Sequence, residues 1–274
     1  MKIKLLLNKD VNYNADVYFK KAKKLKAKLP GLEKAMDVSC EKIENFNKKK
    51  SSYIEKKVQE EVLKNHVKKE WFEKFRWTKT TSGFLFVIGK DSSTNEILIK
   101  KHLENSDIVF HTMASGSPFG ILKTENKEFS KEDLYECGEF LADFSSQWKK
   151  GFGTADVFWV YPNQVTKKAQ SGEYIQKGSF MVYGQKNNLK NLPLRLSLGV
   201  IVKHIELDGK KIKYEELFSG SKKACLKYCD RFINIEPGNN GYKSLTKEIK
   251  NKLRISRIED LPKYIPNNCK ILKK

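Results

Sequence analysis

Apolar or small side chains recur along the first part of the chain at alternating spacings of four and three residues. This heptad pattern is typical of a long helix that packs along one stripe. Asn14, just before the pattern, is the expected N-cap of that helix. The stripe consists of Tyr18, Ala22, Leu25, Leu29, Leu32, Met36, Ser39, Ile43 and Phe46.

Residues 45–52 separate this stripe from a second apolar pattern. They are polar except at one position and indicate a turn, and residues 53–72 then form the second predicted helix. Pro30 and Gly31 should kink or briefly interrupt the first helix, because proline breaks the helical hydrogen-bond ladder. Two helices joined by a short turn fold back on each other. We therefore expect an antiparallel coiled-coil helical hairpin over residues 1–68.

After Trp71 the pattern changes to a period of two and to short apolar runs, which indicate strands. Ser130 and Asp133 have the spacing of a helix N-cap and its capping-box partner, so a helix should begin there. Shorter helices are expected at residues 221–229 and 244–253. The predicted strands are 83–89, 96–100, 107–112, 119–123, 154–161, 178–184 and 198–205.

Runs of strands around one long helix favour the α+β class. We expect an α+β protein, in which the antiparallel coiled-coil hairpin is followed by a mixed α+β domain. The predicted divisions are a basic hairpin at residues 1–68, the main domain at 69–190, and a small basic C-terminal extension at 191–274.

The charge of the chain points to a polyanionic partner. Lys and Arg number 54 against 33 Asp and Glu, which gives a net charge of +21. An excess of this size repels itself and indicates nucleic acid or an anionic membrane surface. The opening holds only Leu5–Leu7 as an unbroken apolar run, too short for a signal peptide or a spanning helix. We therefore expect a cytoplasmic protein with no membrane partner.

The five cysteines are widely scattered and follow no secretion signal, so reduced thiols are expected. No Cys-x-x-Cys pair or histidine stands at zinc-ligand spacing. The sequence therefore predicts no metal site and no cofactor.

Lysines crowd the predicted hairpin. A solvated face explains those of the first helix as well as RNA binding does. The tip is different, because like charges gathered at a turn raise the local potential without stabilising a helix. The three lysines at the predicted tip are Lys48, Lys49 and Lys50.

Two polar segments early in the predicted domain carry candidate chemistry. Residues 71–77 place four large rings beside Lys74 and Arg76, a combination that suits RNA bases and phosphates or a plain core. Residues 89–96 form a polar turn between two predicted strands, and they lack the spacing of a P-loop.

Two later segments add a donor-rich turn and more cations. Residues 111–120 end a predicted strand with His111, Ser115 and Ser117 among glycines, a composition that can form an anion-binding nest. A structural histidine is the alternative for His111, and a nucleophilic serine lacks both its elbow motif and an acidic partner. The last segment, residues 161–184, surrounds a predicted strand pair with Lys167, Lys168 and Lys177.

In this order, the four segments resemble the RNA-binding domain of the NFACT family over roughly residues 69–188. The match includes Glu70–Trp77, residues 89–91 with 95–96, residues 107–118, Ser145–Lys149, residues 162–167, and residues 172–174 with 177–181. The opening residues 11–28 are similar to the start of that family's coiled-coil middle region. We predict that RNA is contacted by residues of these segments, and the ribosome by the lysines of the hairpin tip. The RNA-contacting residues are Lys74, Arg76, Lys90, Asp91, Asn95, His111, Ser115, Ser117, Trp148, Lys149, Lys167, Lys168 and Lys177, and the ribosome-contacting ones are Lys48, Lys49 and Lys50.

Membership would imply binding to a large ribosomal subunit that carries obstructed peptidyl-tRNA, and recruitment of tRNA for C-terminal tailing. The ribosome supplies that chemistry, so no enzyme activity is expected. The sequence lacks counterparts of the family's N-terminal domain, its helix-hairpin-helix segment and its Asp-Arg motif. The chain alone should therefore bind without supporting tailing, or it should act together with a separately encoded N-terminal half. Lys90 also stands where many members have Arg, and a lysine makes no bidentate phosphate fork.

Two other functions remain open at this point. A nuclease or nucleotide-processing enzyme could use His111, Asp91 and Glu96. A basic coiled-coil adaptor could use the hairpin to recruit a protein partner.

Overall fold

The structure is a computed structural model that describes residues 3–66, 70–114, 116–168, 175–207, 210–255 and 261–272. Its contacts divide the chain into two compact units, Met1–Lys69 and Glu70–Lys274. The two units are described separately below.

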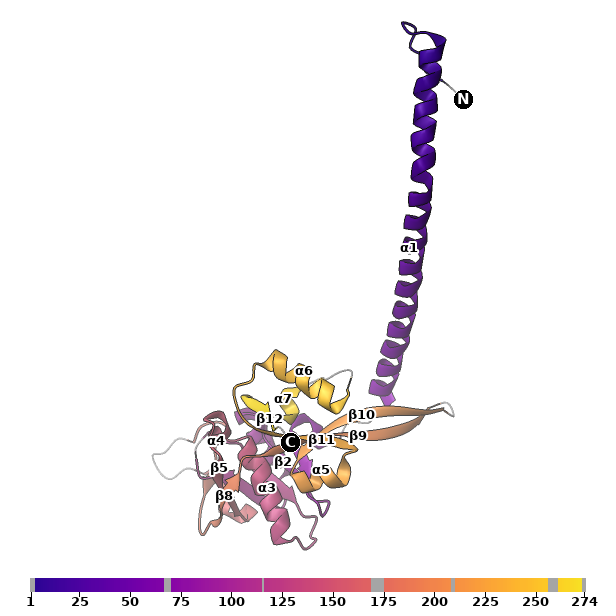
Figure 1. Ribbon diagram of the computed structural model, residues 1–274. Helices are drawn as coiled ribbons and strands as arrows, with labels where there is room; N and C mark the ends of the chain where they lie inside the picture. The colour runs from indigo at the N-terminus through magenta and orange to yellow at the C-terminus, as the bar shows by residue number, and fades with distance from the viewer. Residues whose placement is uncertain are drawn as a thin grey trace. The chain divides into compact units, whose positions relative to one another are not determined.

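The first unit is built on one helix, α1 (Val11–His66), and not on a hairpin (Figure 1). The helix runs without a break through Pro30 and through residues 45–52, so the predicted hairpin, its tip and the interruption are wrong. Residues 45–52 contain neither Gly nor Pro, and Lys, Asn and Ser each cost a helix less than about 1 kcal/mol. A polar composition is therefore no turn signal by itself.

The start of α1 also differs from the prediction. Asp10 takes the capping role, since its Oδ1 accepts a hydrogen bond from the Tyr13 backbone N–H at 2.8 Å. Asn14 lies inside the first turn, where its buried amide accepts from the Leu6 N–H at 2.8 Å and donates to the Leu6 carbonyl at 3.1 Å. Asn14 thus holds the preceding turn against the helix. The heptad stripe itself is open, with Leu25 57% exposed and Phe46 69% exposed.

The second unit confirms the predicted α+β class. Its main sheet has six strands in the order β1-β2-β4-β3-β5-β8, and each neighbouring pair is antiparallel. These strands are β1 (Arg76–Lys79), β2 (Leu85–Ile88), β3 (Ile108–Thr112), β4 (Gly120–Lys123), β5 (Thr154–Val160) and β8 (Asn187–Pro193).

Helices cover both faces of this sheet. In β2, Phe86 packs in one core with Leu141 of α3 (Lys131–Asp143), whereas Val87 packs in another with Leu98 of α2 (Ser92–His102). Successive strand residues point to opposite faces, so α3 and α2 lie on opposite sides of the sheet. The predicted cap of α3 is confirmed, since Ser130 and Asp133 form its capping box.

The predicted strand at residues 96–100 is wrong, because this segment belongs to α2. Asp91 Oδ1 accepts from the Thr94 N–H at 2.8 Å, and Thr94 Oγ1 accepts from the Asp91 N–H at 2.9 Å. This reciprocal cap satisfies two donors of the first turn and outweighs the strand preference of the isoleucines that follow. Residues 89–91 consequently lead from a strand into a helix N-terminus.

A second antiparallel sheet, in the order β10-β9-β11-β12, shares its core with the first. Leu198 and Ile235 of this sheet belong to the same buried cluster as Phe86 and Leu141. The predicted domain boundary between residues 190 and 191 stays a prediction. The strands are β9 (Leu196–Leu207), β10 (Lys210–Gly220), β11 (Arg231–Pro237) and β12 (Cys269–Ile271), and the helices near them are α5 (Lys222–Tyr228), α6 (Tyr242–Leu253) and α7 (Leu261–Tyr264).

The remaining short elements border the candidate site. Of the predicted strand at 178–184, only β7 (Met181–Val182) forms, and it pairs with β6 (Val165–Thr166). The others are η1 (Trp71–Lys74), α4 (Ser146–Lys149) and η2 (Pro162–Gln164).

Candidate nucleic-acid interface

One pocket of about 890 Å³ gathers segments that lie far apart in the sequence. It is bordered by the N-terminus of α2, the turn after β3, residues 176–182 and residues 262–267. Among the described residues that line it, the only carboxylate is Asp91, and the cations are Arg76, Lys90, Lys149, Lys177 and Lys186. This imbalance gives the pocket a positive lining, which favours an anionic ligand.

Aromatic rings hold two of these cations in place. The Arg76 guanidinium lies 4.7 Å from the centroid of the Phe144 ring, and the Lys186 amine lies 4.6 Å from that of Phe158. Burial lowers the pKa of Arg76, but a guanidinium remains charged in proteins. Its Nε is buried without a hydrogen-bond partner in the structure. Arg76 is therefore a positive charge held against an aromatic ring, and its Nε–H group donates no hydrogen bond in the structure.

The carboxylate in the pocket is occupied by its own helix. Hydrogen bonds from the Thr94 and Ser93 backbone lower the pKa of Asp91, so it stays ionised as the N-cap of α2. Asn95 is also used internally, because its Oδ1 accepts from the Phe119 N–H at 3.3 Å. Both residues line the pocket, but their side chains form hydrogen bonds within the protein and so fix the shape of the pocket wall.

The histidine at the end of β3 is bound on both sides by backbone carbonyls. Its Nδ1 lies 2.7 Å from the Thr112 oxygen and its Nε2 lies 3.2 Å from the Ser117 oxygen. Burial lowers the pKa of His111, although both carbonyls favour the charged ring. Ser117 Oγ accepts from the Ser146 N–H at 3.3 Å. These contacts fix the turn after β3, while Ser115 lies outside the described residues.

Trp148 supports the pocket from behind. Its ring is fully buried, and its Nε1 donates to the carbonyl of Asn267, a pocket residue, at 3.1 Å. The predicted RNA contact of Trp148 is wrong, because a ring with no exposed surface cannot stack on a base. Its neighbour Lys149 is exposed and lines the pocket.

The aromatic segment before β1 is mostly packing. Phe75 is fully buried, and the Trp71 ring stacks on His102 with centroids 4.2 Å apart. The half-buried Trp77 ring meets Phe218 edge-on at 5.9 Å. Lys74 is exposed but does not line the pocket. Of this segment, only Arg76 reaches the pocket.

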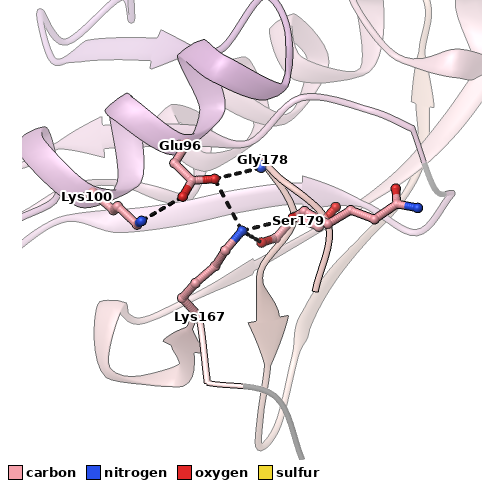
Figure 2. Close-up of polar contacts among 6 residues, drawn as sticks. Glu96, Lys100, Lys167, Gly178 and Ser179 are labelled. Atoms are coloured by element: carbon pink, nitrogen blue, oxygen red, sulfur yellow. Dashed lines mark hydrogen bonds and ion pairs between the residues drawn. The ribbon is translucent and has the colours of Figure 1, made fainter. Parts of the chain in front are cut away.

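The three lysines of the last segment have different roles. Lys177 is exposed and lines the pocket, whereas Lys168 is exposed outside it. Lys167 binds inside the protein: its Nζ lies 3.2 Å from Glu96 Oε2 and donates to two backbone carbonyls (Figure 2). The predicted RNA contact of Lys167 stays a prediction, because its amine is engaged within the protein in this conformation.

The nuclease alternative gains no support from this geometry. Glu96 is engaged with lysines, Asp91 caps α2, and His111 faces carbonyl oxygens. Within the described ranges, no three His, Cys, Asp or Glu side chains lie close enough to hold a metal ion. None of the helices described there is both long and apolar enough to cross a membrane.

Comparison with known proteins identifies the domain that carries the pocket. Residues 74–184 match the family described as the NFACT protein RNA binding domain. An archaeal Rqc2 homolog of Methanocaldococcus jannaschii is 38% identical over 217 residues, which are 77% of this chain and 31% of that protein. The chain belongs to the NFACT family.

Other NFACT relatives are similar over shorter stretches. The human ribosome quality control complex subunit NEMF is 34% identical over 134 residues, 48% of this chain and 12% of that protein. The chain thus spans about a third or less of these relatives. A solved structure of the C-terminal part of the fibronectin/fibrinogen-binding protein from Streptococcus suis is 18% identical, with a TM-score of 0.37 over 50% of this chain and 55% of that one.

The NFACT motifs did not reveal every residue of the pocket. Lys186 lies beyond the matched range, and nothing in the sequence distinguishes it from the other lysines of the chain. Residues 262–267 reach the pocket from the other end of the chain, where Asn267 accepts the Trp148 bond. Only the fold brings these residues together.

Proposed function

We propose that this chain is an RNA-binding component of ribosome-associated quality control and that the pocket is its RNA contact. The observation that carries the proposal is the lining of the pocket: its described residues include five cations and one carboxylate, and most of them lie inside the matched RNA-binding domain. Phosphates would lie against Arg76, Lys90 and Lys149, and the Phe144 ring would limit the movement of the Arg76 guanidinium.

The relatives support the ribosomal setting. Their names place them in ribosome quality control, as an Rqc2 homolog and as subunits of a ribosome quality control complex. By analogy we propose that this chain binds the large ribosomal subunit with obstructed peptidyl-tRNA, binds tRNA, or does both, in the cytoplasm. A separately encoded N-terminal half is proposed as the partner for tailing.

The ribosome contact at Lys48, Lys49 and Lys50 stays a prediction, but the local structure from which it was argued is different. All three residues belong to α1, so they are not gathered at a turn. The side chains of Lys48 and Lys49 lie outside the described residues, and Lys50 is exposed. A ribosome contact there would involve the helix and not a tip.

We expect RNA binding to weaken steeply with salt, because lysine and arginine contacts to phosphate release counterions. For three to five contacts on single-stranded RNA, the log–log slope of affinity against salt should lie between about −2 and −3.5. The measurement is a titration of short fluorescent single-stranded RNA, of tRNA and of purified large subunits at several salt concentrations. A slope near zero on all three would contradict the proposal.

A further inference from the structure

A short strap, defined here as Gln176–Phe180, forms one wall of the pocket and is fastened from outside it. Glu96 Oε2 accepts from the Gly178 N–H at 2.8 Å and lies 3.2 Å from Lys167 Nζ. The same Nζ donates to the carbonyls of Gln176 at 2.9 Å and Ser179 at 3.0 Å (Figure 2). One carboxylate and one amine therefore bind the strap at three backbone positions.

The strap sits directly on the first turn of α2. Gly178 has φ +79°, and a Cβ at this position would lie 2.4 Å from the Cα and carbonyl oxygen of Ser92. Only glycine combines that backbone conformation with so close an approach. The carboxylate that receives the strap stays charged: the bonds from Lys100, Gly178 and Lys167 lower the pKa of Glu96 to about 2.

The fastening residues and the pocket residues are separate sets. Glu96 and Lys167 do not line the pocket, whereas Lys177 and Phe180 of the strap do. Lys167 also lies 5.0 Å from the Phe180 ring centroid, and that ring meets Phe119 edge-on at 5.4 Å. Fixing the strap thus fixes both a cation and a ring of the wall.

On the basis of the proposed function, we infer that Glu96 and Lys167 are positioning residues for RNA binding. They clamp the strap on α2 so that Lys177 faces a phosphate in the pocket. A carboxylate in a strongly basic protein here favours RNA binding, the reverse of its direct electrostatic effect. This opposite sign makes the inference sharply testable.

The test compares Glu96→Ala with Glu104→Ala in the full chain, using short fluorescent single-stranded RNA. Glu104 is a matched control, because it also pairs with a lysine, Lys123 at 3.2 Å, and does not line the pocket. Each substitution raises the net charge by one, so electrostatics alone predicts tighter binding for both. The clamp predicts that Glu96→Ala binds about tenfold more weakly, as for one lost phosphate contact, while Glu104→Ala binds equally or more tightly.

A double-mutant cycle separates positioning from general destabilisation. In the Glu96→Ala background, Lys177→Ala should cause little further loss, because Lys177 is already misplaced. Lys149→Ala, on another wall of the pocket, should keep its full effect there. Additive losses for Lys177→Ala, or tighter binding by Glu96→Ala, would overturn the inference.

Amide hydrogen exchange without RNA tests the clamp independently of the proposed function. Removal of the Glu96 carboxylate should speed exchange at the Gly178 N–H, which loses its acceptor. Unchanged exchange there would overturn the clamp even if RNA binds. If the unaltered chain does not bind RNA, the proposed function fails, and the exchange result still decides whether the clamp exists.

Discussion

Reversing three exposed cations of the pocket, by Lys90→Glu, Lys149→Glu and Lys186→Glu together, should reduce RNA affinity by at least about a hundredfold. All three side chains are exposed and line the pocket, so the substitutions leave the buried cores intact. A hydrogen bond to a charged group contributes about 1.5–3 kcal/mol, and each reversal also adds repulsion against phosphate. Fluorescence titration with single-stranded RNA and with tRNA measures the loss.

The matched control makes the same change of charge elsewhere. Lys131, Lys222 and Lys247 are exposed lysines of the second unit that do not line the pocket. Their triple change to Glu should weaken binding only through the lower net charge, by a factor that salt removes. Equal losses in the two triple variants would mean that the whole surface, and not the pocket, binds RNA.

Substitutions at two adjacent residues should change the free energy of unfolding and the RNA affinity to different extents. Trp148→Ala removes a fully buried ring and its bond to Asn267, so it should lower the free energy of unfolding by about 3–5 kcal/mol. Lys149→Ala changes an exposed side chain and should leave that energy within about 0.5 kcal/mol. Denaturant unfolding measures both variants.

RNA affinity should show the opposite order. Lys149→Ala should weaken binding about tenfold through one lost phosphate contact. Trp148→Ala, measured at a temperature where it remains folded, should lose less RNA affinity than Lys149→Ala does. Complete loss of binding by a folded Trp148→Ala protein would contradict this order and would show that the support of the pocket by this ring is required for RNA binding.

The parts of the fold that the sequence predicted correctly are those with local chemical signals. Ser130 and Asp133 mark the start of α3 because a capping box is complete within four residues. The short apolar run at residues 85–88 marks β2 as a strand, as predicted. Such signals do not depend on the rest of the chain.

The secondary-structure predictions were wrong in segments whose local sequence preference is weak. In one such segment the hydrogen bonds of a helix cap outweigh that preference, and in another no such bond decides between a turn and a helix. Asp91 and Thr94 cap a helix over residues whose short apolar run, 97–99, is rich in strand-forming isoleucine. The polar residues 45–52 allow either a turn or a helix, and continuing α1 costs little. The sequence of an exposed helix contains few signals of where the helix ends.

The candidate site was predictable only where the family motifs cover it. Arg76, Lys90 and Lys149 fall within the matched range and do line the pocket. Lys167 falls within it too, yet its amine fastens the strap, because Glu96 lies within bonding distance. Lys186 came from outside the motifs. Which cation faces RNA and which faces a carboxylate depends on contacts between distant segments.

Protection of lysine amines from chemical labelling would show whether RNA lies in the pocket. The full chain would be labelled with and without tRNA, and each lysine read by mass spectrometry. We expect tRNA to protect the exposed pocket lysines Lys90, Lys149, Lys177 and Lys186, and to leave Lys131, Lys222 and Lys247 reactive. Full reactivity of the four pocket lysines in the presence of saturating tRNA would contradict the account.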